Sequence, residues 1–482
     1  MAVSLYTVRV VLAVLGAEDY GIYNVVAGVV VLFGFVNGAM ASGTQRFLNF
    51  YLGRGDTERV RETYSASLVI HAIIALVFVV LAETVGLWFV GSKLNIPEGR
   101  HGAAMAAYQL ATVTSILNIL RVPYNAVIIA YERMDFFAYI SIIEAVLKLA
   151  VVFLLRLGSA DRLILYAALL AAVSAAILLA YGLFCKKNFE AARFMRVRNA
   201  PLVREMTAFS GWSLFGAAAN VSCSQGTNIV LNVFTNVTVN AAMGIANQVN
   251  AAVYSFVSNF QTAFNPQIVK SWAAGDGEGF RRLLIRSSKY SFFLLWLIVL
   301  PLYVNADIVL LLWLGEVPEY AVQFVRLTLV WSLIESINGL LYMAINAAGR
   351  IKLYQIIIGC INILNVPLTI FAFSLGFAPE WLLYIRIGVN VIALGFRVVF
   401  CRRMVCLPVQ QFFAESVFRP LLIVFVSSAM TIIAEKNIQG PYVSLFITSI
   451  VSLVSTSLLV FFVGMGRSER ISVFARISGK FR

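Results

Sequence analysis

Charged residues, histidine and cysteine are all scarce in this chain. Asp, Glu, Lys and Arg make up only 12% of its 482 residues, whereas hydrophobic residues make up 61%. That composition excludes a set of soluble domains and is typical of a membrane protein. The histidines, His71 and His101, and the five cysteines form neither the ligand pattern of a zinc site nor the spacing of a disulfide framework. We therefore expect no metal and no cofactor.

Two sequence patterns are also absent. The alternation of polar and apolar residues that builds membrane β-barrels does not occur, so the apolar runs are predicted to be helices. No Walker motif occurs either, so we expect a proton or sodium gradient rather than ATP to drive any transport. The sequence thus predicts an all-α polytopic membrane protein.

Apolar runs separated by polar breaks predict about fourteen transmembrane helices. The predicted spans are 1–16, 22–50, 64–90, 103–130, 135–157, 162–185, 208–232, 239–269, 284–304, 319–347, 353–375, 380–401, 416–434 and 442–464. The first span rises only about 24 Å, against a hydrocarbon core of about 30 Å. We expect that Met1 lies inside a longer first helix; a tilted helix in a thinned bilayer is the alternative.

The net charge of +14 is concentrated in alternate connections between the predicted spans. Lys and Arg gather near residues 54–61, 133, 186–204, 270–289, 350–352, 402–403 and 467–482. Basic loops stay in the cytoplasm, so this pattern predicts that both termini are cytoplasmic. The charge is therefore a topology signal, and we expect no nucleic-acid partner.

Two short matches indicate an internal duplication. The segment "YNAVIIA" from Tyr124 matches "YMAINAA" from Tyr342, and "GDTERVR" from Gly55 matches "GDGEGFR" from Gly275, at separations of 218 and 220 residues. Each separation contains six predicted helices, so the two copies have the same orientation and are related by an axis along the membrane normal. We expect a six-helix bundle over 1–186, a basic cytoplasmic linker over 187–205, a second six-helix bundle over 206–404, and helices 13 and 14 with a basic tail over 405–482.

Ionisable residues inside predicted spans are candidates for function, because each costs about 3 kcal/mol on insertion scales. The cations are Arg9, Arg46, Arg121, Arg326 and Arg386, and the other candidates are Glu144, Lys148 and Glu335. Glu144 and Lys148 stand at i and i+4, which predicts a mutually neutralised pair that could also serve ion coupling if it faces a cavity. Arg46 and Arg397 lie near the inner ends of their spans, where snorkelling to the headgroups is the alternative role.

One predicted helix carries a polar face within the membrane. Its members recur at helical spacing: Asn247, Asn250, Tyr254, Ser258 and Gln261. Hydrogen bonds between packed helices would explain these residues. The wall of a wet cavity suited to sugar hydroxyls would explain them equally well, so both interpretations stay open.

Three stretches carry a resemblance to a known family. "LGAEDYGIYNVVAGVV", "AMASGTQRFLNFYLGRGD" and "PYNAVIIAYERMDFFAYISIIEAVLKL" resemble the Wzx-like O-antigen and capsule flippases, which belong to the multidrug/oligosaccharidyl-lipid/polysaccharide (MOP) exporter superfamily. The resemblance implies two six-helix bundles around a central cavity, often with two extra helices. It also implies the bacterial inner membrane, an undecaprenyl-diphosphate-linked oligosaccharide as substrate, and other polysaccharide-assembly proteins as partners.

The same resemblance implies roles for the candidate residues. Family members have a cationic cavity to which arginines of the first two helices contribute, and Arg9 and Arg46 occupy those helices here. We expect Arg9, Arg46, Arg121, Arg326 and Arg386 to bind the diphosphate, because the guanidinium group forms bidentate hydrogen bonds with phosphate. The polar face would meet the sugars, and alternating access would come from rocking of the bundles.

Other functions remain open at this stage. A multidrug exporter of the same superfamily is the main alternative, although the first span offers Arg9 and no acid for a cationic drug. A membrane-embedded polysaccharide polymerase or ligase would need a large outward loop with catalytic residues, and the predicted outward loops are short. A scaffold for other assembly proteins would not need so many buried charges. We expect a transporter rather than an enzyme.

Overall fold

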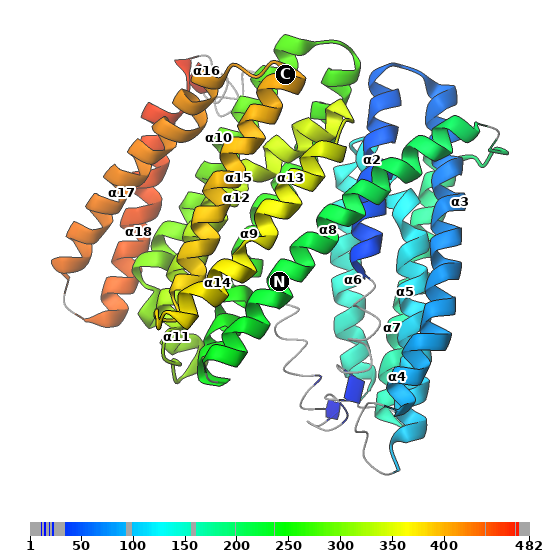
Figure 1. Cartoon of the computed structure of the whole chain (residues 1–482), viewed down its shortest axis with the longest axis horizontal. Helices are drawn as coiled ribbons and strands as arrows, with labels where there is room; N and C mark the ends of the chain where they lie inside the picture. Colours follow the sequence, from blue (N-terminus) through cyan, green and yellow to red (C-terminus); the bar gives the residue numbers. More distant parts are fainter. Residues whose placement is uncertain are drawn as a thin grey trace. The chain divides into compact units, whose positions relative to one another are not determined.

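The computed structural model describes a helical protein (Figure 1). The described residues are 34–92, 99–155, 161–197, 199–235, 237–438, 440–467 and 469–471, together with Val11, Val14, Leu15, Asp19, Ile22 and Tyr23. Within these ranges every regular element is a helix. The prediction of an all-α membrane protein built from two helical bundles is confirmed.

Chain contacts divide the molecule into two compact units, Met1–Ala218 and Ala219–Arg482. Unit 1 contains α2 (Gly34–Gly53), α3 (Thr57–Leu81), the π-helical turn η1 (Ala82–Gly86), α4 (Leu87–Ser92), α5 (His101–Ala130), α6 (Met134–Leu154), α7 (Arg162–Asn188), the short η2 (Glu190–Ala192) and the first part of α8 (Ala200–Phe234). The predicted domain boundaries at 186, 205 and 404 stay a prediction.

Unit 2 takes the rest of α8 and the helices that follow it. These are α9 (Val237–Ala273), α10 (Gly277–Val304), α11 (Ala306–Leu314), α12 (Ala321–Ala348), α13 (Lys352–Ile363), α14 (Asn365–Ser374), α15 (Trp381–Val405), α16 (Val409–Phe413), η3 (Ala414–Phe418), α17 (Arg419–Lys436), α18 (Pro441–Leu459) and η4 (Val460–Gly464). α12 contacts α9, α10 and α15, and α17 and α18 pair with each other and pack on α10.

Ten helices in the described ranges are long and apolar enough to cross a membrane. They correspond to ten of the predicted spans. The predicted spans 208–232 and 239–269 are the helices α8 and α9, which are not among the ten. The predicted span 1–16 and the first part of 22–50 lie mostly outside the described residues.

Matched local structures support the predicted duplication. Gly55 and Gly275 both adopt the left-handed backbone, with φ of +71° and +77°, a conformation that glycine reaches without steric cost. The aspartate after each glycine caps the next helix: Asp56 accepts from the Arg59 N–H at 3.0 Å, and Asp276 accepts from the Gly279 N–H at 2.9 Å. The two "GD" segments therefore fold as the same turn and helix start.

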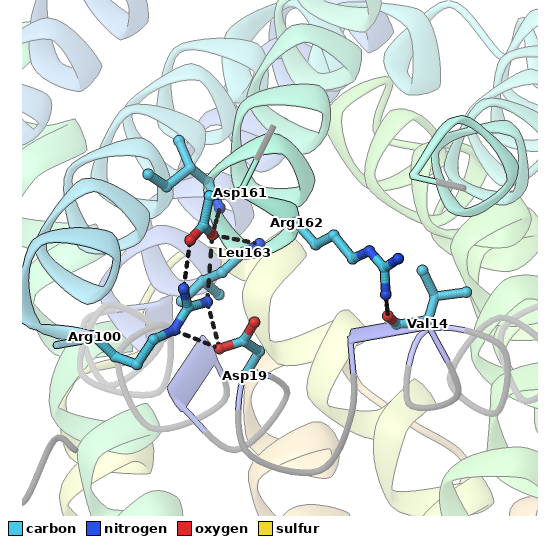
Figure 2. Close-up of polar contacts among 7 residues, drawn as sticks. Val14, Asp19, Arg100, Asp161, Arg162 and Leu163 are labelled. Atoms are coloured by element: carbon cyan, nitrogen blue, oxygen red, sulfur yellow. Dashed lines mark hydrogen bonds and ion pairs between the residues drawn. The ribbon is translucent and has the colours of Figure 1, made fainter. Parts of the chain in front are cut away.

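One end of unit 1 is held together by a charged cluster (Figure 2). The Arg100 guanidinium bridges two aspartates, donating from Nε to Asp19 Oδ1 at 2.9 Å and from its terminal nitrogens to Asp161. Asp161 also caps α7 by accepting from the Leu163 N–H at 3.0 Å. Burial alone would raise the pKa of Asp161, but the hydrogen bonds from Arg100 and from the helix backbone outweigh burial and lower that pKa. The cluster thus joins three segments at the end that the charge pattern predicts to be outward.

A second charged cluster fixes the residues after η4. Glu469 accepts from Lys289 Nζ at 2.8 Å and from Arg286 Nε at 2.8 Å, and it also accepts from the Gly466 N–H at 2.8 Å. Lys289 is only 1% exposed. Burial alone would raise the pKa of Glu469, but the contacts with Lys289 and the hydrogen bond from the Gly466 N–H together outweigh burial and lower that pKa. The end of the last span is therefore tied to α10.

Candidate functional site

A cavity of about 370 Å³ lies inside unit 2. Its lining side chains come from α8, α12, α13, α14 and α15, and they include Asn220, Cys223, Ser224, Thr227, Trp331, Glu335, Asn362, Asn365, Arg386, Asn390 and Arg397. Polar and ionisable groups are costly to bury within membrane spans, so their presence in these spans indicates a functional site. We call this the unit 2 cavity.

An ion pair lies along one wall of the unit 2 cavity. Arg397 is 8% exposed, and its Nη1 lies 3.7 Å from Glu335 Oε2. Its Nε donates to the hydroxyl oxygen of Tyr354 at 3.0 Å. Breaking such a pair leaves one buried charge uncompensated, which costs about 3–5 kcal/mol. Arg397 is therefore held by Glu335 on one side and by Tyr354 on the other.

Asn390 extends the same network toward the aromatic wall. In the amide orientation that satisfies its neighbours, its nitrogen donates to Glu335 Oε2 at 3.2 Å and its oxygen accepts from Trp331 Nε1 at 3.1 Å. Because Asn390 lies between the carboxylate and the indole, it couples their positions. Glu335 thus has a cation on one side and an amide donor on the other.

Arg386 is held differently from Arg397. Its guanidinium lies over the Trp331 ring, 4.2 Å from the ring centroid. Within the described ranges no carboxylate lies within ion-pair distance of Arg386, and its guanidinium is stacked on the indole face. The donors of such a group stay available to an anion in the cavity.

The remaining wall is rich in amides. Asn362 Nδ2 donates to Asn220 Oδ1 at 2.8 Å, which links α13 to α8. Asn365 and Thr227 line the same cavity. Neutral amide and hydroxyl groups of this kind hydrogen-bond polar solutes or water without adding net charge.

Of the predicted site residues, Arg386 and Glu335 meet in the unit 2 cavity. The network around them also contains residues that the sequence analysis did not select: Trp331, Tyr354, Asn390 and Arg397. Snorkelling to the headgroups is one of the roles that the sequence leaves open for Arg397, and the structure instead turns it inward to Tyr354 and Glu335. Trp331 and Glu335 stand at i and i+4, and so do Arg386 and Asn390. This spacing is the sequence signal that could have grouped them.

Three predicted residues meet in unit 1 instead. Glu144 accepts from Arg121 Nη1 at 3.0 Å and from Lys148 Nζ at 2.7 Å. The structure thus shows the expected contact of Glu144 with Lys148 and adds Arg121 to it. A carboxylate shared by two cations leaves the group with one net positive charge. Its part in ion coupling stays a prediction.

Arg46 and Arg326 lie in separate environments. Arg46 is 8% exposed, lies 4.0 Å from Glu205 Oε1, and is stacked on Phe47 and Phe209 at 4.5 and 5.1 Å. Arg326 donates to the Tyr303 carbonyl oxygen at 3.0 Å and to Asp307 at 2.6 Å. Neither lines the unit 2 cavity. Arg9 lies outside the described residues, so the predicted diphosphate role stays a prediction for all three.

The predicted polar face of α9 contacts α12. Gln261 is 3% exposed and donates from Nε2 to the Ser336 carbonyl oxygen at 2.7 Å, and Asn250 accepts from the Ser332 hydroxyl. Tyr254 lies near Gly339 in the same interface, whereas Asn247 is half-buried and Ser258 is exposed. These contacts support the helix-packing interpretation for Gln261 and Asn250. Sugar binding by this face stays a prediction.

Comparison with known proteins relates the chain to transporters. Residues 213–371 match the MatE family model. No curated protein matches the chain significantly in sequence. The matched region contains α9 to α13, together with most of α8 and α14, and so it includes residues of four of the five helices that line the unit 2 cavity.

Solved structures share the fold at low sequence identity. An outward-facing multidrug resistance MATE family transporter of the MOP superfamily is 14% identical, with 84% of this chain and 93% of that chain covered and a TM-score of 0.71. A MOP superfamily transporter from Pyrococcus furiosus, described as having a binding pocket of reversed polarity that suggests a different function, is 13% identical, with 84% and 93% covered and a TM-score of 0.69. A MATE transporter from Vibrio cholerae, VcmN, is 17% identical, with 83% and 92% covered and a TM-score of 0.63. The chain therefore has the fold of MATE transporters.

Proposed function

We propose that the chain is a secondary transporter of the MOP superfamily that exports organic solutes across the cell membrane. The observation that carries the proposal is the shared fold, which extends over 84% of the chain at a TM-score of 0.71 to a multidrug resistance transporter. The MatE match over 213–371 adds a sequence relation in the region of the cavity. Export of the multidrug type, the alternative of the sequence analysis, has better support from these comparisons than the flippase does.

The unit 2 cavity is the proposed solute site. Its Trp331 ring offers an apolar surface, its amides offer hydrogen bonds, and Arg386 and Glu335 offer opposite charges. A mixed lining of this kind suits an amphipathic molecule that carries a polar or ionised group. The cavity could therefore accept solutes of more than one shape.

A second candidate function is the flipping of an undecaprenyl-diphosphate-linked oligosaccharide. The observation that favours it is charge: Arg386 and Arg397 line the unit 2 cavity against the single carboxylate of Glu335. An arginine without an ion pair is well shaped to hold a phosphate. The resemblance of the sequence to Wzx-like flippases agrees with this candidate, and a location in the bacterial inner membrane with both termini in the cytoplasm is part of the same proposal.

Coupling to an ion gradient completes the proposal. Glu335 and the Arg121, Glu144 and Lys148 group are the ionisable residues proposed for it, because protonation of a carboxylate changes the pairing of the cations beside it. Alternating access by the two bundles would then expose the cavity to each side in turn. Neither step needs a bound cofactor or a catalytic residue.

A reconstituted assay tests the two candidates against each other. The protein in proteoliposomes is given a proton or sodium gradient, and efflux of fluorescent cationic and anionic dyes is measured beside flipping of undecaprenyl-diphosphate-linked oligosaccharide. Dye efflux that falls in Arg386→Ala and persists in Arg402→Ala, an exposed cation of α15 outside the cavity, supports the exporter. Glycolipid flipping without dye efflux supports the second candidate. Folded protein that moves neither contradicts the proposal.

A further inference from the structure

A second cavity, of about 630 Å³, lies in unit 1. Its lining residues come from α3, α5 and α7 and from residues 192–194 after α7. Its lining residues are Tyr64, Leu68, Leu120, Tyr124, Leu178, Leu179, Gly182, Leu183, Lys186, Ala192, Arg193 and Phe194. All of them belong to unit 1, so this cavity is separate from the unit 2 cavity. We call it the unit 1 cavity.

Most of the unit 1 cavity is apolar and open to the surroundings of the helices. Leu179 and Leu183, on the α7 side, are 65% and 69% exposed. The inner wall is aromatic, where the rings of Tyr64 and Tyr124 meet edge to face at 6.0 Å. In a spanning helix such a surface faces hydrocarbon, so an acyl chain can occupy it without exposing apolar atoms to water.

One end of the unit 1 cavity is cationic. Lys186, at the end of α7, and Arg193, just after η2, both line it and both have exposed side chains. The Arg193 carbonyl oxygen accepts from Arg61 Nε at 3.0 Å, which fixes the segment that carries Arg193 against α3. Both cations lie at the end that the charge pattern predicts to be cytoplasmic. That end is where an anionic headgroup of the inner leaflet would lie.

The spacing along α7 matches the shape of a lipid. Leu179 and Lys186 are seven residues apart, which is about 10 Å along a helix. A phosphate at Lys186 and Arg193 therefore places the upper part of an acyl chain beside Leu183, Leu179 and Leu120. A soluble anion would use the cations and leave the apolar part of the cavity empty.

We propose that the unit 1 cavity binds an anionic glycerophospholipid, with its phosphate at Lys186 and Arg193 and one acyl chain along the leucines of α5 and α7. The lipid bridges α3, α5 and α7 and holds the segment after η2 in place. This site is independent of the transported solute, because none of its residues line the unit 2 cavity. Charge complementarity selects an anionic lipid over a zwitterionic one.

Native mass spectrometry of the detergent-solubilised full chain tests the site with phosphatidylglycerol and phosphatidylcholine. We expect retained phosphatidylglycerol on the wild type and a loss of about fivefold in affinity for each cation removed, since one basic residue near a membrane surface contributes about a factor of five. Lys186→Ala with Arg193→Ala should therefore weaken phosphatidylglycerol about 25-fold. Lys187→Ala is the matched control, because Lys187 is exposed beside Lys186 and does not line the cavity.

A second variant blocks the apolar part without changing charge. A Cβ at Gly182 would lie 3.8 Å from Tyr124 Cε1, an ordinary contact, so the larger side chain of Gly182→Leu is expected to enter the cavity. Phosphatidylglycerol should be lost from this variant, while its elution profile and its unfolding temperature without added lipid match those of the delipidated wild type. If Gly182→Leu does not fold, the charge variants still decide the question.

Three results would overturn the lipid site. The first is equal retention of phosphatidylcholine and phosphatidylglycerol by the wild type. The second is the same loss in Lys187→Ala as in the double variant. The third is full displacement of phosphatidylglycerol by glycerol 3-phosphate, which would show that a free phosphate group satisfies the cations and that the apolar part contributes nothing.

Discussion

Arg397 donates a hydrogen bond from Nε to the Tyr354 hydroxyl oxygen at 3.0 Å, and its Nη1 lies 3.7 Å from Glu335. A single guanidinium therefore connects α15 to α12 and α13. The contact fixes one end of the cationic wall of the unit 2 cavity, while Arg386, 11 residues earlier in the chain, rests on an indole ring. The two arginines of this cavity are thus held differently: Arg397 is fixed by Tyr354 and Glu335, whereas Arg386 keeps its hydrogen-bond donors available.

Removing Arg397 should destabilise unit 2. Arg397→Met leaves Glu335 without its cation, and we expect a loss of about 3–5 kcal/mol in the free energy of unfolding. Thermal unfolding of the detergent-solubilised protein measures it. The double variant Arg397→Met, Glu335→Gln should recover part of the loss, because it removes both charges. If the double variant loses as much as the sum of the single variants, the pair is not coupled.

Removing Arg386 should reduce transport more than it reduces stability. Arg386→Ala removes only a stacking contact with Trp331, so we expect a loss of about 0.5–2 kcal/mol in stability. Transport of a substrate that carries an anionic group should fall at least about tenfold, which corresponds to about 1.4 kcal/mol of binding or transition-state free energy. Initial transport rates in proteoliposomes measure this loss, with Arg402→Ala as the control. Unchanged rates for every anionic substrate would remove Arg386 from the site.

The contact of Gln261 with Ser336 predicts a packing role. Gln261→Met keeps the length of the side chain and removes its hydrogen bond, and we expect about 1 kcal/mol less stability with unchanged transport. Gln248→Met, at an exposed position of the same helix that is not part of the polar face, should change neither. A variant of Gln261 that keeps its stability and loses transport would instead favour the sugar-binding interpretation of this face.

The Arg100 cluster predicts a dependence of stability on pH. Because the pKa of Asp161 is lowered in the folded protein, its stabilising effect is complete above its unfolded pKa, about 3.9, and is lost as the pH falls through the lower folded pKa. Asp161→Asn keeps a capping side chain and removes the charge. The unfolding temperature of the wild type should exceed that of the variant above about pH 4, and the gap should close at lower pH. A gap that is constant with pH would contradict the ion pair.

Much of the fold follows from the sequence, because apolar runs and the positions of Lys and Arg respond directly to the bilayer. The bundle architecture was predictable from those runs and from the "GD" and "YNAVIIA" repeats. The unit 2 cavity was only partly predictable. Arg386 and Glu335 stand out as charges in apolar spans, but Arg397 near the end of a span has the same sequence signal whether it turns toward headgroups or inward. Its direction is set by Tyr354 and Glu335 on other helices, which local sequence does not report.

Polar residues of α9 show the same limit. Their helical spacing predicts a face, and the face exists, yet spacing alone does not tell whether a helix or a solute covers it. α12 supplies the partners of Gln261 and Asn250, and those partners lie 75 and 82 residues further along the chain. Asn220 and Asn362 hydrogen-bond each other although they are 142 residues apart in the sequence. A local sequence pattern therefore does not predict this contact either.

The contact of Glu469 with Lys289 has a consequence for the order of biosynthesis. The ribosome makes Lys289 180 residues before it makes Glu469, so the Lys289 ammonium reaches the membrane long before its partner exists. A buried cation without its carboxylate is unfavourable, and α10 should settle fully only after the last helix has been inserted. Ribosome-stalled intermediates that end before Glu469 should therefore leave Lys289 open to amine-reactive reagents, and release of the finished chain should close it.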